Sequence, residues 1–513
     1  MKKKRRYRSG LRKLFGRRAL ILLAILFQIV FLIFMLFSSY RFRWVSIFFT
    51  AVSIATALHL MIRSDKSAFK LSLVFLILLF PLYGGVFYWV FHFQTASVGF
   101  RKRLNAFSRG QRAAVEKSED ALSRATAQMP RDGKLLRYLQ NTPAFPVYQN
   151  TSVQYFPSGK EMHQKMLEDL RRAERYIFME YFIIEEGVMW DSILEILEER
   201  AAHGVDVRLI YDDLGSILTL PPRYDRNMRE KGIKCRIFNK FHPFLTTLQN
   251  NRDHRKITVI DGRIAYTGGV NLADEYIGEK IRFGTWKDNA VRLCGEGAAS
   301  FTLMFLGMWS LLCRQTEDVH RYLPTPHFTA ISDGWVQPFS DTPMDRENVG
   351  EHVFLHAFER AQKYLYITTP YLMVGDELLA ALKFCARSGV DVRVITPFVP
   401  DKKPVHFTTR SYYRELIEAG VKIYEFSEGF IHAKTVISDG DFAMVGTVNM
   451  DYRSLYLHME CGVCLYGSVA IKEIEKDFLD TQERCREITL ADCKGNFFVR
   501  LMQQICRVFA PLM

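Results

Sequence analysis

The chain has 513 residues, of which 49% are hydrophobic and 13% are aromatic. This composition excludes general disorder and is enough for two or three domains with large cores. The formal net charge is +14, but ten of the basic residues lie within residues 1–18, which contain no acidic residue. The charge is therefore concentrated in a tail suited to anionic lipid headgroups, and it gives no evidence for a nucleic-acid groove.

Three apolar runs follow this basic tail. Residues 19–40, with Gln28 as the strongly polar interior residue, are long enough to cross a bilayer at ~1.5 Å per residue. Residues 45–62 make a weaker segment that carries Ser, Thr and His, and residues 71–93 are again strongly apolar. We predict membrane segments here, with the N-terminus in the cytoplasm by the positive-inside rule. Whether two or three of them span, and so which membrane face bears the rest of the chain, is left open.

An internal repeat of about 180 residues fills most of the remaining chain. After a polar tether at residues 94–150, we expect one domain at 151–330 and a second at 331–513. The pentapeptide Gly-Val-Asp-Val-Arg occurs at both 204–208 and 389–393. Each copy lies within a strand–helix–strand signal, which predicts a doubly wound α/β layer twice over. These signals are at 175–183, 190–202 and 205–211, and again at 363–372, 376–387 and 390–396.

The last stretch, residues 497–512, has apolar residues at helical spacing with Arg500 and Arg507 between them. This is the pattern of an amphipathic helix. A terminal helix packed on the protein and a helix at a membrane surface both fit it.

Two stretches share the pattern H-x-K-x4-D-x6-G-[GT]-x-N. A single copy could arise by chance, but two copies with identical spacing are a strong signal. The shared positions are His254, Lys256, Asp261, Gly269 and Asn271 in the first copy, and His432, Lys434, Asp439, Thr447 and Asn449 in the second.

Each copy is predicted to be a hairpin with an Asp-Gly turn. On a strand, His and Lys are two residues apart and share one face, whereas Asp, seven residues after His, faces the other side. We therefore expect Asp261 and Asp439, which complete the candidate catalytic set, to anchor the turn. The returning strand can bring Asn271 and Asn449 near the His and Lys face.

Two such hairpins together can exchange a phosphodiester through a covalent step. One histidine attacks phosphorus while the other protonates the leaving oxygen, and Lys256 and Lys434 stabilise the equatorial oxygens without a metal. Each imidazole also needs a carboxylate on its other nitrogen. Glu460 follows His432 by 28 residues, and Asp288 follows His254 by 34. They are the candidate partners of these histidines.

Other interpretations explain less. A core histidine accounts for one motif but not for two matched ones. A metal site is not expected, because each His is paired with a Lys that repels a cation. No cofactor is expected either.

At these motifs the sequence resembles the phospholipase D superfamily, and more closely its bacterial cardiolipin synthases. Further matching stretches are at 79–85, 179–184, 212–216, 369–371, 410–413 and 445–454. The resemblance implies two tandem phospholipase D-like α/β/α sandwich domains related by a pseudo-twofold axis, after an N-terminal transmembrane region. It also implies a multi-pass enzyme of the bacterial cell membrane, with the N-terminus cytoplasmic.

The resemblance further implies an activity that joins two phosphatidylglycerols into cardiolipin and glycerol. His254 would be the nucleophile that carries the phosphatidyl group, and His432 the acid and then the base. Asn271, Asn449, Gly269 and Thr447 would contact substrate, although Gly269 departs from the Ser common at that position. A hydrolase of the phospholipase D type, a transferase to another alcohol and an inactive membrane scaffold are the alternatives.

Overall fold

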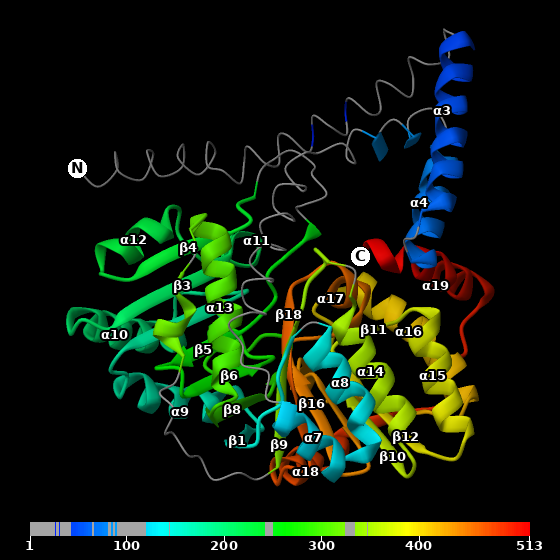
Figure 1. The fold of residues 1–513 in the computed structure, drawn as a ribbon. Helices are drawn as coiled ribbons and strands as arrows, with labels where there is room; N and C mark the ends of the chain where they lie inside the picture. The colour runs from blue at the N-terminus through cyan, green and yellow to red at the C-terminus, as the bar shows by residue number, and fades with distance from the viewer. Residues whose placement is uncertain are drawn as a thin grey trace. The chain divides into compact units, whose positions relative to one another are not determined.

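The computed structural model places two compact units along the chain (Figure 1). One comprises residues 1–98 with 241–250, and the other comprises residues 99–240 with 251–513. The structure describes residues 26, 30, 43–63, 66–80, 84–85, 88–89, 119–142, 144–241, 250–315, 317–323, 334–345 and 347–513.

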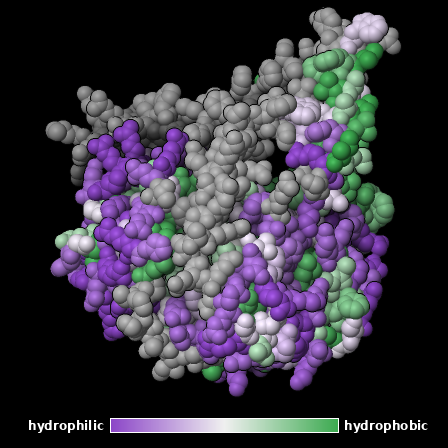
Figure 2. Space-filling view, viewed as in Figure 1, coloured by the Kyte–Doolittle hydropathy of each residue, from purple (hydrophilic) through white to green (hydrophobic). Residues whose placement is uncertain are grey.

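The first unit contains the helices α3 (Arg43–Ile62) and α4 (Ser67–Leu79). Most of their large side chains are apolar and exposed, and Figure 2 shows these helices largely in the colour of hydrophobic residues. The predicted segment at 45–62 is therefore helical, and the one at 71–93 begins inside α4. Of the segment at 19–40, only residues 26 and 30 are described, and the rest lies outside the described residues. Among the described helices, none is both long enough and apolar enough to cross a membrane.

The first half of the second unit is a seven-stranded mixed sheet. Its strand order is β1-β8-β6-β5-β2-β3-β4. The strands are β1 (Thr151–Phe156), β2 (Tyr176–Tyr181), β3 (Asp206–Asp212), β4 (Lys234–Phe238), β5 (Ile257–Ile260), β6 (Ile264–Gly268) and β8 (Ala290–Gly295). Helices α9 (Gly159–Arg171) and α10 (Val188–Ala202) build one core with the sheet, and the almost wholly buried α13 (Ala298–Cys313) packs against β2, β4, β5 and β6.

The second half repeats this arrangement with one added edge strand. Its order is β19-β13-β12-β10-β15-β16-β18-β9. The strands are β9 (Trp335–Asp341), β10 (Tyr364–Thr368), β12 (Asp391–Pro397), β13 (Lys422–Phe426), β15 (Thr435–Ser438), β16 (Phe442–Gly446), β18 (Glu460–Tyr466) and β19 (Cys485–Ile488). The helices are α14 (Val349–Arg360), α15 (Asp376–Arg387), α16 (Lys403–Glu418), α18 (Ala470–Gln482) and the terminal α19 (Phe497–Phe509). The predicted repeat of two α/β layers is confirmed.

Both sheets are mixed: the predicted strand–helix–strand units give parallel neighbours, and the predicted motif hairpins give antiparallel ones. Only β2, β3 and β4, and their counterparts β10, β12 and β13, run parallel to one another. The Asp-Gly pairs at 261–262 and 439–440 have positive φ at both residues, so each makes a tight turn and the following strand returns antiparallel. These turns place the two motif hairpins, β5–β6 and β15–β16, in the middle of their sheets.

Part of the predicted tether at 94–150 is helical. Helices α7 (Glu119–Gln128) and α8 (Gly133–Asn141) belong to the second unit, where α8 packs against α14 and β9. The Gln337 side chain on β9 donates hydrogen bonds to the carbonyls of Leu136 and Phe145. These residues therefore support the second sheet.

Candidate active site

Both motif histidines lie immediately before a hairpin. The strands β5 and β15 begin at Ile257 and Thr435, one residue after the motif lysines. Each lysine folds back on its own segment: Nζ of Lys256 donates to the carbonyl of His254 at 2.6 Å, and Lys434 makes the same bond to His432. His and Lys therefore precede the strand and do not lie on it, so this backbone contact, and not the predicted strand parity, fixes the lysine beside its histidine.

The motif aspartates anchor the hairpins, as their strand parity predicted. Asp261 accepts the backbone N–H groups of Glu174, Arg175 and Tyr176 at 2.7 to 2.9 Å. Asp439 accepts the N–H groups of residues 362–364 at 2.8 to 3.0 Å. Each carboxylate thus ties its turn to the start of the neighbouring strand, β2 or β10.

We expect Asp261→Ala to lower the free energy of unfolding by about 2 kcal/mol, because three backbone donors lose a charged acceptor. The folded fraction should keep most of its turnover. Asp261→Asn retains one acceptor oxygen and should lose less stability. Denaturant titration in detergent, with activity measured per folded molecule, checks this. An Asp261→Ala protein of normal stability but without turnover would place this carboxylate in the chemistry instead.

Each motif histidine contacts a carboxylate that belongs to the other half of the second unit. His254 Nδ1 lies 2.9 Å from Glu460 Oε1, and His432 Nδ1 lies 2.7 Å from Asp288 Oδ2. Sequence spacing predicted the opposite pairing, with each acid serving the histidine of its own half, and that pairing is wrong. The two acids themselves are the predicted ones, and both are buried.

Short backbone pairings between the two halves cause this crossed pairing of histidines and carboxylates. The segment before His432, β14 (Gly429–Ile431), pairs in parallel with β7 (Thr285–Lys287), which leads to Asp288. In the same way His254 N donates to the Met459 carbonyl at 2.9 Å, one residue before Glu460. Each histidine segment therefore runs beside the segment of the other half that carries its acid.

Gly269 and Thr447 occupy matched positions with different chemistry. The Thr447 hydroxyl donates to Glu460 Oε2 and so helps to hold the acid of His254. At Gly269 there is no room for such a group, because an added Cβ would lie 1.9 Å from Asp288 Oδ1. The Asp288 carboxylate therefore occupies the space that a serine side chain at position 269 would need.

We predict that Gly269→Ser lowers turnover by about 100-fold, because it displaces Asp288 from His432 by a large fraction of an ångström. Thr447→Ser keeps its hydroxyl and is the matched control, with most turnover retained. Steady-state rates of the two variants, compared at equal folded concentration, check this. If Gly269→Ser were as active as Thr447→Ser, the close contact with Asp288 would have no catalytic importance.

The two motif asparagines differ in their surroundings. Asn271 accepts the N–H of Ile183 at 3.1 Å and donates to the Tyr276 hydroxyl at 2.7 Å, so its side chain is already engaged. Asn449 is buried, and within the described part of the chain its Oδ1 has no hydrogen-bond partner. A buried amide oxygen without a partner is costly, which marks Asn449 as the better candidate to meet a substrate hydroxyl.

Burial controls the charge of the central groups. It lowers the pKa of His254 well below the ordinary value, and it lowers that of His432 to about 4 against the opposing effect of Asp288. It also lowers the pKa of Lys256 to about 8 and of Lys434 to about 7. The site therefore holds poorly solvated cationic groups close together, and a bound phosphate would supply the missing negative charge.

Lys434→Met should therefore raise the free energy of unfolding by roughly 1–4 kcal/mol while it abolishes turnover. The folded-state pKa of Lys434 lies below its ordinary value, so the unfolded chain binds this proton more tightly. The gain should be full below about pH 7 and vanish as pH rises towards the ordinary lysine value. Denaturant titrations of both proteins at several pH values test it. A less stable Lys434→Met protein at pH 6 would contradict this view.

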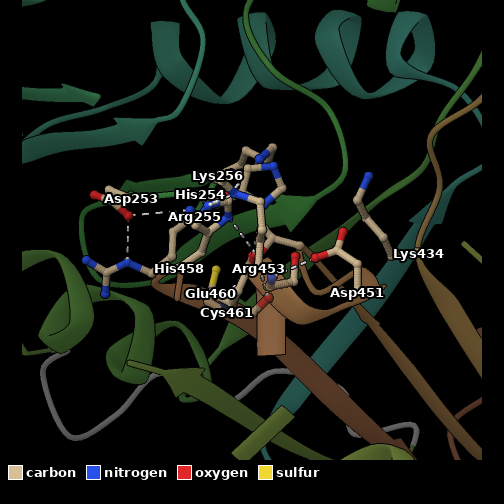
Figure 3. A network of polar contacts seen from close by, with 12 residues as sticks. Asp253, His254, Arg255, Lys256, Lys434, Asp451, Arg453, His458, Glu460 and Cys461 are labelled. Atoms are coloured by element: carbon tan, nitrogen blue, oxygen red, sulfur yellow. Dashed lines mark hydrogen bonds and ion pairs between the residues drawn. The ribbon is translucent and has the colours of Figure 1, made fainter. Parts of the chain in front are cut away.

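A third histidine, His458, lies beside His254, and neither sequence motif includes it. The rings of His254 and His458 lie 5.6 Å apart, and His458 Nε2 accepts a hydrogen bond from Arg453 Nε at 3.3 Å. Figure 3 shows His458, Arg453 and Glu460 gathered beside His254. His458 stands two residues before Glu460, so the helix–loop–strand that delivers this acid also delivers the histidine.

His254, His458 and Glu460 bring three potential metal ligands within 4.8 Å of one another. However, Lys256 and Arg453 both act on the pKa of His458 as nearby positive charges, and Lys256 acts likewise on His254. These neighbours favour an anion over a cation, so the residues present do not fit a metal.

The surroundings of the two histidines are unlike. His432 is lined by aromatic rings, with the centroids of Tyr276, Trp286 and Phe430 5.7 to 5.9 Å from its own. His254 has Phe182 at 5.1 Å and otherwise the polar group around His458. One side of the site is therefore apolar and the other cationic.

Two matched hairpins that bring a His–Lys pair and a crossed carboxylate to each side of one site define the phospholipase D class of fold and site. Comparison with known proteins agrees. A family model described as "Cardiolipin synthase, PLD-like domain" matches residues 143–280 and 354–481. The chain belongs to this family of phospholipase D-like cardiolipin synthases.

Individual relatives support the same assignment. A cardiolipin synthase of Alkalihalophilus pseudofirmus is 32% identical over 474 residues, which cover 91% of this chain and 93% of that protein. An uncharacterised protein of Streptococcus mutans is 46% identical over 380 residues, 74% of this chain and 82% of its own length. The crystal structure of phosphatidylserine synthase from Haemophilus influenzae aligns with 73% of this chain and 96% of its own, with a TM-score of 0.55 and 16% identity, a likeness of fold alone.

Proposed function

We propose that this protein is a cardiolipin synthase that transfers a phosphatidyl group from one phosphatidylglycerol to another through a phosphatidyl-histidine intermediate. The observation that carries the mechanism is the pair of buried His–carboxylate contacts on Nδ1, one from each half. They hold the Nδ1 proton and leave Nε2 of each ring as the nitrogen that can react.

In the first step, His254 Nε2 attacks the phosphorus of the first lipid. The bond from phosphorus to the glycerol headgroup oxygen breaks, and that oxygen takes a proton from Nε2 of His432, which becomes protonated once the anionic phosphate lies beside it. Asp288 stabilises the imidazolium of His432. Burial alone would raise the pKa of Asp288, but the contact with His432 outweighs it and holds this pKa below the ordinary value, so Asp288 stays ionised. The equatorial oxygens meet Lys256 and Lys434, whose amines are fully protonated beside the anion.

In the second step, neutral His432 takes the proton of the primary hydroxyl of the second phosphatidylglycerol. That oxygen attacks phosphorus, the bond from phosphorus to Nε2 of His254 breaks, and cardiolipin leaves. The assignment of His254 as nucleophile rests on an asymmetry of charge. Burial and the neighbouring motif lysine lower the pKa of both histidines. Asp288, whose own pKa is lowered, opposes the effect at His432, whereas burial raises the pKa of Glu460 to about 8, so His254 is the more firmly neutral of the two.

Purified protein incubated with phosphatidylglycerol tests the activity. We expect cardiolipin and glycerol in equal amounts. Phosphatidic acid without cardiolipin would replace this proposal with its alternative, a hydrolase of the phospholipase D type. Products with a different added alcohol would indicate a less selective phosphatidyltransferase.

We also propose that the N-terminal unit attaches the enzyme to a bacterial cell membrane as a multi-pass region with a cytoplasmic N-terminus. The support is the exposure of large apolar side chains along α3 and α4, with Trp44 84% and Ile62 86% exposed. Such a surface is stable only in an apolar surrounding. Protease cleavage between residues 94 and 118 in sealed vesicles would report which side of the membrane the catalytic unit occupies.

A further inference from the structure

The C-terminal helix α19 faces outward with its apolar side. Its first turn is capped by Asn496, whose side chain accepts the N–H of Val499 at 2.9 Å. None of its residues is buried. Phe498 is 73% exposed and Phe497 66%. The large apolar side chains that lie along this one face and are exposed are Phe497, Phe498, Leu501, Met502 and Ile505.

The helix is held to the rest of the second unit through α16. The Arg507 guanidinium donates to Glu415 on α16 at 3.0 Å and lies 4.2 Å from the centroid of the Tyr412 ring. Beyond the helix, Ala510 and Pro511 are buried. The preceding helix in the chain, α18, behaves oppositely, since it buries Ile471, Ile474 and Phe478 against the sheet. A terminal helix that served only packing would be expected to turn its apolar face inward, as α18 does.

We infer that the apolar face of α19 docks on the surface of a phospholipid bilayer that contains anionic lipid. The charge of this segment fits that partner. Between Asp492 and the C-terminus there is no acidic residue, and Lys494 and Arg500 are basic and exposed, whereas Arg507 is paired with Glu415. An apolar face rimmed by cations is the form of helix that lies in the interface of an anionic membrane.

The structure favours lipid over a protein partner in one further respect. The face consists of flexible or aromatic side chains along a single helix, with few polar groups among them to give a specific protein contact. If the proposed function holds, docking here would also bring the catalytic unit to its lipid substrates, but the inference itself does not depend on that function.

Tryptophan fluorescence of the full-length protein in vesicles tests the docking. Phe498→Trp adds an indole to the apolar face, and Phe384→Trp, at a residue 75% exposed on α15, is the matched control. Emission is compared with that of the unmodified chain in vesicles of phosphatidylglycerol and phosphatidylcholine, with and without bromine on the acyl chains. We expect bromolipid to quench the indole added by Phe498→Trp and to leave the one added by Phe384→Trp unchanged. The quenching should weaken in vesicles of phosphatidylcholine alone.

Three results would overturn the inference. One is a Phe498→Trp indole that stays unquenched with the emission of a solvent-exposed group. Another is a blue-shifted emission without quenching, because this would mean that the N-terminal unit or a second copy of the chain covers the face. The third is equal quenching at both positions, since α19 would then have no special contact with lipid. None of these measurements requires catalysis, so they remain informative even if cardiolipin is not the product.

Discussion

With phosphatidylglycerol as donor, His254→Gln and His432→Gln should each lower the rate of cardiolipin formation by about 10⁴-fold or more. Groups that act as one catalytic unit lose most of the rate when any one of them is removed. The two variants should nevertheless differ when the donor is phosphatidyl-p-nitrophenol, whose leaving group departs without a proton. His432→Gln should release one equivalent of p-nitrophenolate per enzyme and then stop, whereas His254→Gln should release none.

The reason is that the two histidines perform different steps. An activated donor removes the need for the acid in the first step, but the second step still needs a base to activate the acceptor hydroxyl. Stopped-flow absorbance measures the burst, and the thermal unfolding of each variant in detergent confirms that it is folded. A burst in His254→Gln but not in His432→Gln would exchange the two roles.

Loss of each buried carboxylate should reproduce the defect of the histidine in the other half. We expect Asp288→Asn and Glu460→Gln to lower turnover with phosphatidylglycerol by about 10²–10⁴-fold, because a neutral amide holds the imidazole in the wrong tautomer. With the activated donor, Asp288→Asn should keep a fast burst, since its effect is on His432. Glu460→Gln should slow the burst itself, since Glu460 contacts His254.

Exposed acids on α10 give matched controls. Asp191→Asn and Glu195→Gln remove the same charges far along the sequence from both motifs and should retain normal rates. If Asp288→Asn lost the burst and Glu460→Gln kept it, the carboxylates would act within their own halves. The crossed contacts would then not describe the working enzyme.

Much of the site could be predicted because it depends on local sequence patterns. The matched spacing of His254 and His432 with their lysines, and the parity that separates Asp261 from them, depend on residues near one another in the chain. The Asp-Gly turns likewise follow from the preference of that pair for positive φ. These features were therefore accessible without any knowledge of how the halves meet.

The crossed pairing could not be predicted in the same way. Asp288 reaches His432 because β7 pairs with β14 across the two halves, and three-residue strands leave almost no signal in the sequence. Glu460 and His458 similarly depend on the contact between residues 252–254 and Met459.

The C-terminal helix has a second feature that periodicity cannot predict, namely the orientation of its apolar face. The pattern of residues 497–512 defines an apolar face but not the direction in which it points. That direction is set by Arg507, which turns towards Glu415 and Tyr412 and so leaves Phe498 and its neighbours outside. The orientation of the helix therefore depends on the contact between Arg507 and Glu415, which lie 92 positions apart in the sequence.

The most direct test of the proposed chemistry is to find the covalent intermediate. His432→Gln protein is mixed with phosphatidyl-p-nitrophenol, digested, and analysed by mass spectrometry under mildly alkaline conditions that preserve phosphohistidine. We predict one phosphatidyl group per chain, on the peptide that contains His254, and none in the protein that carries both His254→Gln and His432→Gln. A phosphatidyl group on another residue, or p-nitrophenolate release with no adduct, would contradict a mechanism in which His254 carries the phosphatidyl group between the two lipids.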